Sequence, residues 1–324
     1  ETVDFDPMLV DAEPQMRERV RTQAFVAYDG AEPVGRILAI FDRRYQERHA
    51  EPAAFFGFYE AVPRDPVAFG MLEAAADWAR AQNLTRLYGP VNLFLTYGAG
   101  LLVSGHGQPA LVGMPHNPPY YDDQLTRWGL RKVKDLHSYA VSIPRSDRPR
   151  GRADVVNWRP IAGLSFRHMD PTRFDEEIET IRGIYNDAFV DFWGFVPSDP
   201  AEFARLADGF RPVLDEELVV FVEVDGRPVG YLMAFPDVNR VSGDGPPRHA
   251  RIDMLAVHPD YQNTWVGGML IFEMLRRLHS KGYETAEAAP ILEDATWPRS
   301  LRGRALQLTR VYRVYGRSLV PGAA

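Results

Sequence analysis

Apolar residues recur at helical spacing in the second half of the chain, and two such stretches begin at an Asp-Pro pair. Asp170-Pro171 and Asp199-Pro200 each predict a helix start, because aspartate accepts hydrogen bonds from free backbone N–H groups and proline at the first helical position loses no bond. A third helix is expected over residues 266–278, where the apolar positions follow the same period.

Runs rich in β-branched and aromatic residues alternate with these helices and predict strands. Two of them, 218–224 and 228–235, flank the turn 225–226 (Asp-Gly) and predict a hairpin. Further elements are expected as strands over 164–169, 251–257, 285–291 and 309–315, and as a helix over 299–306.

The first half repeats this order without repeating the letters. The expected elements are a hairpin (25–28 and 34–41), a strand (53–61), a helix opened by Asp65-Pro66, a strand (86–89), a helix (119–128) and a strand (132–143). The repeated order predicts an α/β fold with two domains in tandem, each a mixed, partly antiparallel twisted sheet flanked by helices.

A proline-rich stretch separates the two halves. Residues 144–160 carry five arginines and little apolar periodicity, which is typical of a linker. Two domains also suit a chain of 324 residues, so we expect one domain over 1–150 and another over 151–324.

Composition narrows the chemistry. The 37 basic and 44 acidic residues give a net charge of −7, which disfavours a globally basic nucleic-acid binder. The chain has no cysteine, which excludes a disulfide framework, a thiolate metal site and an acyl-cysteine intermediate. The eight histidines show no paired spacing, so no metal is expected. No apolar run approaches the roughly 18 residues of a membrane span, and residues 1–20 do not resemble a signal peptide, so we expect a cytoplasmic protein without membrane contact.

The stretch 253–268, reading DMLAVHPDYQNTWVGG, carries the clearest candidate site. A strand ends at Val257, and after a short loop a helix begins with Gly267 and Gly268 near its start. Glycines admit a ligand close to the backbone, and the first helical turn offers free N–H groups and the positive end of a dipole, which suits a pyrophosphate. The alternative is a plain strand–loop–helix whose glycines only ease packing.

This stretch resembles the GNAT superfamily of acyl-CoA-dependent N-acyltransferases, whose signature is Val-x-Pro-x-x-(Gln/Arg)-x-x-Gly-x-(Gly/Ala). Val257, Pro259, Gln262 and Gly267 match it, whereas Trp265 stands at the first glycine position. The resemblance implies that the backbone of Leu255 and Val257 pairs with the pantetheine arm of the acyl-CoA co-substrate. It implies that the diphosphate is held by the amides of Gln262, Asn263, Thr264, Trp265, Val266, Gly267 and Gly268.

Other runs are similar to a bacterial family of tandem-GNAT proteins. They include 89–92 (Gly-Pro-Val-Asn), 117–121 (Asn-Pro-Pro-Tyr-Tyr) and 192–197 (Phe-Trp-Gly-Phe-Val-Pro), and the resemblance covers about residues 25–317. The first half lacks the glycine-rich run after its strand, since residues 62–65 read Val-Pro-Arg-Asp. We therefore expect a degenerate GNAT-like domain first and a GNAT domain with the acyl-CoA loop second.

Three residues are candidates for acid–base catalysis, because amine acylation requires a deprotonated amine and a protonated leaving thiolate. Asp253 is expected to share a strand face with Leu255 and Val257, since side chains alternate along a strand, and by resemblance it matches the basic glutamate of the histone-acetylating branch. Glu293, just past the fifth strand, is a candidate to bind the amine or act through water, and Tyr312 is a candidate acid. The alternatives are a surface or ion-paired aspartate at 253, a helix-capping role for the neighbouring Asp294, and a packed aromatic at 312.

Aromatic residues follow the first helix of the second half, at positions 189, 192, 193 and 195. In the GNAT fold this region often covers the acceptor site, and such side chains suit an apolar acceptor. Core packing is the alternative.

The preferred function is transfer of an acyl group from acyl-CoA, such as acetyl-CoA, to the amine of a small-molecule or amino-acid-like acceptor by direct attack. A second hypothesis keeps the fold but takes an aminoacyl group from tRNA, as in proteins resembling the Fem enzymes, and a carrier-protein thioester is a further candidate donor. A third is a non-catalytic ligand-binding protein, which the Trp265 departure favours.

Overall fold

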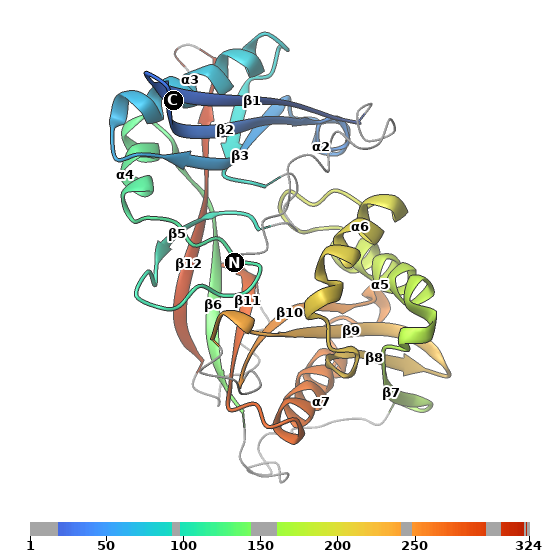
Figure 1. Ribbon diagram of the computed structural model, residues 1–324. Helices are drawn as coiled ribbons and strands as arrows, with labels where there is room; N and C mark the ends of the chain where they lie inside the picture. Colours follow the sequence, from blue (N-terminus) through green and yellow to red (C-terminus); the bar gives the residue numbers. More distant parts are fainter. Residues whose placement is uncertain are drawn as a thin grey trace. The chain divides into compact units, whose positions relative to one another are not determined.

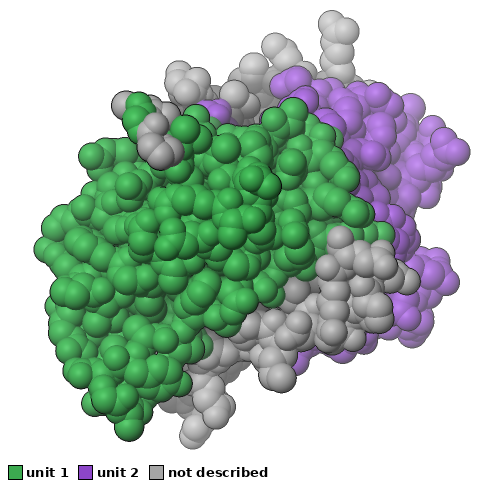
Figure 2. All heavy atoms as spheres, turned by 90° about the horizontal axis from the view of Figure 1, so that it is seen from above, with its two compact units in different colours: residues 1–137, 309–324 green, residues 138–308 purple. Residues whose placement is uncertain are grey.

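The computed structural model describes residues 19–92, 98–143, 161–240, 248–295, 306–320 and 322. The chain divides into two compact units, unit 1 with residues 1–137 and 309–324, and unit 2 with residues 138–308 (Figure 2). The sequence placed the boundary at residue 150 and left the chain end in the second domain. The difference arises because the last strand, β12 (Gln307–Ser318), pairs antiparallel with β4 (Arg86–Gly89) of unit 1.

Unit 1 is a mixed sheet with the strand order β1-β2-β3-β4-β12 (Figure 1). Its remaining elements are β1 (Val20–Asp29), β2 (Glu32–Asp42), α2 (Arg43–His49), β3 (Ala53–Ala61), α3 (Asp65–Arg80), β5 (Leu101–Ser104), α4 (Tyr120–Arg127) and the start of β6 (Arg131–Ser142). β1, β2 and β3 are antiparallel neighbours, β3 and β4 are parallel, and β5 pairs with β12.

The core of unit 1 forms where α3 covers the sheet. The apolar face of α3, with Ala68, Met71 and Leu72, packs against strand residues such as Ile37 and Phe56. Tyr315 and Leu319 from the end of the chain belong to the same core, so this unit is completed by residues distant in sequence.

Unit 2 has the strand order β11-β10-β9-β8-β7. Its strands are β7 (Leu164–His168), β8 (Val219–Val224), β9 (Arg227–Pro236), β10 (His249–Val257) and β11 (Thr285–Leu292). β7 to β10 are antiparallel, and β11 runs parallel to β10. The helices α5 (Phe174–Ala188) and α6 (Pro200–Phe210) cover one face, and α7 (Val266–Ser280) covers the other (Figure 1).

The two faces of the unit 2 sheet build separate cores. Val266, Leu270 and Met274 of α7 pack on one face, and Ile181 and Phe203 of α5 and α6 pack on the other. Both Asp-Pro starts have the expected cap: Asp170 accepts from the N–H of Thr172, and Asp199 accepts from that of Glu202.

The fold class expected from the sequence is confirmed, and most elements lie within a few residues of their predicted bounds. The sequence missed α2 and β5. The linker at 144–160 and most of the helix expected over 299–306 lie outside the described residues. No helix in the described ranges is both long and apolar enough to cross a membrane.

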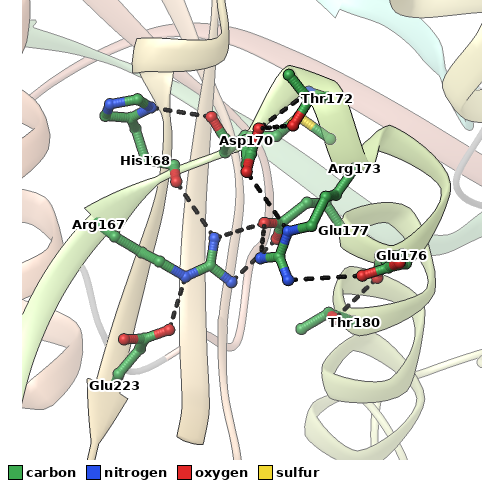
Figure 3. A network of polar contacts seen from close by, with 10 residues as sticks. Arg167, His168, Asp170, Thr172, Arg173, Glu176, Glu177, Thr180 and Glu223 are labelled. Atoms are coloured by element: carbon green, nitrogen blue, oxygen red, sulfur yellow. Dashed lines mark hydrogen bonds and ion pairs between the residues drawn. The ribbon is translucent and has the colours of Figure 1, made fainter. Parts of the chain in front are cut away.

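An ion-pair network joins β7, β8 and the start of α5 (Figure 3). The guanidinium of Arg167 donates to both carboxylate oxygens of Glu177, at 2.7 and 3.0 Å, and to Glu223 at 2.6 Å. Arg173 adds a bond to Glu177 at 3.2 Å. Because the Glu177 side chain is only 2% exposed, these arginines balance a buried carboxylate and fix α5 to the edge of the sheet.

Candidate active site

A β-bulge interrupts β10 at the predicted site. Ile252 pairs with Ala234 and Leu255 pairs with Leu232, so Asp253 and Met254 together lie opposite a single residue, Met233. The extra residue reverses the alternation of side chains between the two faces of the sheet. Before the bulge, Ile252 lies in the α7 core, whereas after it Ala256, another even-numbered residue, lies in the α5–α6 core.

The bulge corrects one expectation. Leu255 and Val257 pack against the α7 core, as do Ala250 and Ile252. Arg251 lies between Ala250 and Ile252 in the strand and so faces the opposite side of the sheet, and Asp253 bonds to it there. The prediction that Asp253 shares a face with Leu255 and Val257 is therefore wrong, because strict alternation fails at a bulge.

β10 and β11 part at the same place. Their parallel pairing runs from His249–Thr285 to Ile252–Ala288 and then stops, although β10 continues to Val257 and β11 to Leu292. Proline at position 290 has no N–H to donate to a neighbouring strand. Within the described part of the chain, the edge of β10 toward β11 is thus unpaired over residues 253–257, and we call this opening the fork.

A buried ion pair lies at the base of the fork. Arg251 Nη2 donates to Asp253 Oδ1 at 2.6 Å, and Arg251 Nε donates to the carbonyl of Ala289 in β11 at 3.2 Å. Burial raises the pKa of the Asp253 carboxyl above its usual range, and the charge and hydrogen bond of Arg251 oppose that shift only partly. A carboxylate with a raised pKa is a better proton acceptor.

Tyr231 of β9 is a further titratable group beside this pair. Its side chain is fully buried, and its hydroxyl lies 3.4 Å from Met254 Sδ. Burial raises the pKa of Tyr231 well above its usual value, and the charges of Tyr185 and Asp253 add to that effect. Tyr231 therefore stays protonated next to the fork, and no motif in the sequence singles it out.

The loop after β10 is held by its own side chains. Pro259–Tyr261 form a 3-10 turn, and Gln262 Nε2 donates to the carbonyls of Val257 at 3.0 Å and of Ala188 in α5 at 3.1 Å. The backbone N–H of Gln262 donates to the carbonyl of Pro259 at 3.1 Å. The signature glutamine thus fixes the loop between β10 and α5, and its amide already has an acceptor.

The backbone amides at the start of α7 differ from that of Gln262, because two of them have no acceptor among the described residues. Thr264 Oγ1 accepts from the N–H of Val266 at 3.3 Å, and the bond from Met269 to the carbonyl of Trp265 is the first within the helix. Among the described residues, no protein group accepts a hydrogen bond from the amides of Gly267 and Gly268, as expected for the first turn of a helix. Trp265 is half-buried at the N-cap position.

Neither glycine is required by the protein around it. A Cβ on Gly268 would meet nothing within 4 Å, and one on Gly267 would make ordinary contacts with Val257 and Leu255, at 3.9 and 4.0 Å. Neither residue has a positive φ. Since glycine costs a helix about 1 kcal/mol relative to alanine, contacts with the described residues do not account for the presence of these two glycines.

The other predicted residues are spread more widely. Glu293 and Asp294 form a turn directly after β11, the second strand of the fork. The turn is closed by a hydrogen bond from the N–H of Ala295 to the carbonyl of Leu292 at 2.9 Å. Tyr312 belongs to unit 1, where it is 1% exposed and pairs with Leu102 of β5. The structure therefore groups Asp253, Leu255, Val257 and 262–268 around the fork, and Tyr312 lies in the other unit.

The aromatic residues after α5 divide into core and surface. Phe195 is buried, with its ring centroid 5.6 Å from that of Tyr185. Phe192 is 40% exposed and Val190 is 43% exposed. Gln262, in the loop of the fork, donates a hydrogen bond to the carbonyl of Ala188. The exposed Val190 and Phe192 come two and four residues after Ala188 in the chain.

Within the ranges that the structure describes, no group of three or more histidine, aspartate or glutamate side chains is arranged to hold a metal ion.

Comparison with known proteins identifies the family of this chain. The model of the acetyltransferase (GNAT) family matches residues 178–294. The chain is 32% identical over 301 residues to a bacterial ceramide synthase of Caulobacter vibrioides (strain NA1000 / CB15N), covering 85% of this chain and 78% of that protein. It is 26% identical over 325 residues to protein YghO of Escherichia coli (strain K12), covering 92% and 82%.

Solved structures show the same architecture. A tandem GNAT protein from the clavulanic acid biosynthesis pathway superposes with a TM-score of 0.56 at 16% identity, over 94% of this chain and 85% of that one. A GCN5-related N-acetyltransferase from Sphaerobacter thermophilus gives a TM-score of 0.51 at 13% identity, over 93% and 82%. The chain belongs to the GNAT family as a tandem GNAT protein, and it is an acyltransferase.

Proposed function

We propose that the protein transfers an acyl group from an acyl-CoA to the primary amine of a long-chain amino alcohol, forming an amide. The observation that carries this proposal is the fork, an unpaired strand edge that ends at a helix start cleared of side chains and that has a buried carboxylate at its base.

The donor is proposed to lie along the free edge of β10. The amide groups of its pantetheine arm add to a strand edge as another strand would. Its diphosphate is proposed to bind the amides at the start of α7, at Gly267 and Gly268, where the helix dipole favours negative charge. This placement aims the thioester carbonyl toward Asp253.

The reaction is a direct attack. The amine nitrogen forms a bond to the thioester carbonyl carbon, and the C–S bond then breaks to give the amide and a thiolate. Asp253 is proposed to take the proton that the amine loses, and the thiolate leaves with a proton from solvent or from a nearby acid. The absence of cysteine agrees with transfer that forms no acyl-enzyme.

The acceptor class rests on two observations. The relative covering 85% of this chain is named a ceramide synthase, and a ceramide is an amide between a fatty acid and a long-chain amino alcohol. The exposed Val190 and Phe192 offer apolar surface next to the segment that Gln262 ties to the fork. A long hydrocarbon chain is the natural occupant of such a surface.

The test is an assay of the purified full chain with acyl-CoAs of increasing length and with sphinganine, free amino acids or short amines as acceptors. We expect release of free CoA thiol together with an amide product identified by mass spectrometry, with sphinganine preferred. Failure of every acyl-CoA to give thiol release with any amine would overturn the proposal. Amide formation from aminoacyl-tRNA in the same assay would assign the donor to tRNA instead.

A further inference from the structure

A pocket of about 850 Å³ lies in unit 1, at the end of the sheet where β4 begins. Arg86 is the first residue of β4 and pairs with Ser318 of β12 at this end. The charged residues that line the pocket are five cations and one acid: Arg80, Arg86, Arg131, Lys132, Arg317 and Glu73. The lining is therefore strongly basic, although the chain as a whole is acidic.

Three of these cations are paired with carboxylates. Arg80 lies 2.7 Å from Glu73 and 2.6 Å from Asp77. Lys132 lies 2.9 Å from Asp135, and Arg86 lies 3.8 Å from Glu51. Their charges are largely balanced by the protein.

Arg131 and Arg317 are different. Arg131 Nη1 donates to the carbonyls of Leu130 at 3.1 Å and of Thr126 at 3.3 Å, and Arg317 Nη1 donates to the carbonyl of Trp128 at 2.7 Å. The Arg317 guanidinium also lies over the Trp128 ring, 4.3 Å from its centroid. Among the residues whose positions are described, neither arginine has a carboxylate within 4.0 Å.

These contacts position the two guanidinium groups without neutralising them. A backbone carbonyl and an aromatic face hold an arginine in place but leave its full positive charge. Two fixed, uncompensated guanidinium groups in one pocket suit a phosphate group, whose oxygens accept paired N–H donors. The remaining wall is partly apolar, with Val133, Leu319 and Val320, which suits the carbon part of a phosphate ester.

We propose that this pocket of unit 1 binds a phosphate ester through Arg131 and Arg317. The site is separate from the fork, since all of its lining residues belong to unit 1 and the fork belongs to unit 2. It is also not a copy of the fork within unit 1, because it lies at the amino end of β4, whereas sheets of this class bind ligands beyond the carboxyl ends of their parallel strands.

The phosphate ester has two chemical sources, a soluble metabolite or the headgroup of a phospholipid. We would titrate the full chain with glycerol 3-phosphate and with pyrophosphate by calorimetry, and sediment it with phosphatidylcholine vesicles prepared with and without phosphatidic acid. Saturable binding of a soluble ester supports the proposal and assigns a soluble ligand. Binding only to phosphatidic acid vesicles supports it and assigns a lipid headgroup.

Variants test whether the pocket is responsible. Arg131→Gln is expected to weaken binding about tenfold or more, because a charge-assisted hydrogen bond to phosphate is lost, and Arg317→Gln should act in the same direction. Arg36→Gln, an exposed arginine of β2 that lies 3.9 Å from Glu60, is the matched control and should leave binding unchanged. Binding should also weaken as salt concentration rises.

The proposal fails if neither soluble esters nor phosphatidic acid vesicles bind, or if Arg131→Gln binds as the unmodified chain does. Because Arg131 is exposed and bonds only to backbone carbonyls, its variant is expected to fold, which a thermal unfolding curve checks. Acyl transfer by Arg131→Gln is expected to equal that of the unmodified chain without phosphate ester. Failure of this proposal is therefore distinguishable from failure of the transferase assignment.

Discussion

At the scale of single residues, the Arg251–Asp253 pair is the centre of the proposed chemistry of the fork. Asp253 is buried enough to raise its pKa, yet its carboxylate keeps one charged partner at 2.6 Å. In the proposed role as base, a carboxyl with a raised pKa is a stronger proton acceptor than an exposed aspartate.

The substitution Asp253→Asn tests the base directly. We expect kcat to fall about 10²-fold or more, because removing a general base costs typically that much. The measurement is thiol release at saturating acyl-CoA and amine. Asp208→Asn, which changes an exposed carboxylate in α6, should keep full activity, and equal losses in the two variants would contradict the assignment.

Arg251 is predicted to act through Asp253. Arg251 opposes the rise in the pKa of Asp253, so Arg251→Gln should raise that pKa further. A base must be deprotonated to work, and the acidic limb of the profile of kcat/KM against pH should therefore move to higher pH. A variant that loses activity equally at every pH would show that Arg251 is only structural.

The glycines at the start of α7 allow a test that separates ligand binding from folding. Gly268→Ala should stabilise the protein by up to about 1 kcal/mol, since alanine favours a helix and its Cβ meets nothing within 4 Å. If a diphosphate occupies that space, KM for acyl-CoA should rise several-fold. Gly183→Ala in α5 is the matched control, because its Cβ also meets nothing, and it should stabilise the protein without changing KM. An unchanged KM in both variants would remove the diphosphate from this position.

At the scale of elements, most of the fold could be predicted because its signals are local. Asp-Pro pairs begin α3, η4 (Pro171–Arg173) and α6 where the sequence placed them. Asp225-Gly226 form the turn between β8 and β9, and Gly30 follows Asp29 in the turn between β1 and β2. The bulge in β10 could not be predicted, since the run Asp253–Leu255 contains no glycine and only pairing with β9 reveals it. The Arg251–Asp253 spacing in a strand was the one available signal for the ion pair.

The network around Glu177 predicts where unit 2 is vulnerable. Glu177→Ala leaves Arg167 and Arg173 without their buried partner and should lower the free energy of unfolding by about 2 kcal/mol, less than for a fully buried pair because Arg167 is partly exposed. The measurement is urea unfolding. Glu176→Ala, whose side chain is 73% exposed, should change stability by less than about 0.5 kcal/mol. Equal effects would show that burial of Glu177 is unimportant.

At the scale of the whole molecule, the sequence predicted two similar units but not which strand completes each. The composition of residues 309–315 predicts a strand but not its neighbours. Its pairing with β4 and β5 depends on contacts between segments far apart in the sequence, which no local pattern encodes. The candidate site could be proposed from the sequence for the opposite reason, because most of its residues are contiguous in the chain.

Removing β12 should therefore destabilise unit 1, although most of unit 1 is far from β12 in the sequence. A chain ending at residue 306 loses Tyr315 and Leu319 from the core of unit 1 and leaves β4 without its β12 neighbour. We expect hydrogen exchange to show loss of protection in β4 and α3, with α5 to α7 of unit 2 protected as before. Retained protection throughout unit 1 would contradict this expectation.

The position of β12 also fixes the order of events during synthesis. Because the ribosome makes a chain from its amino end, the first half of the polypeptide emerges well before β12, the strand that pairs with β4 in its own sheet. Unit 1 must wait, with β4 lacking this neighbour, until β12 has been made, whereas the strands of unit 2 are all available earlier. In the cell, the part of the protein that is made first is thus the part that finishes folding last.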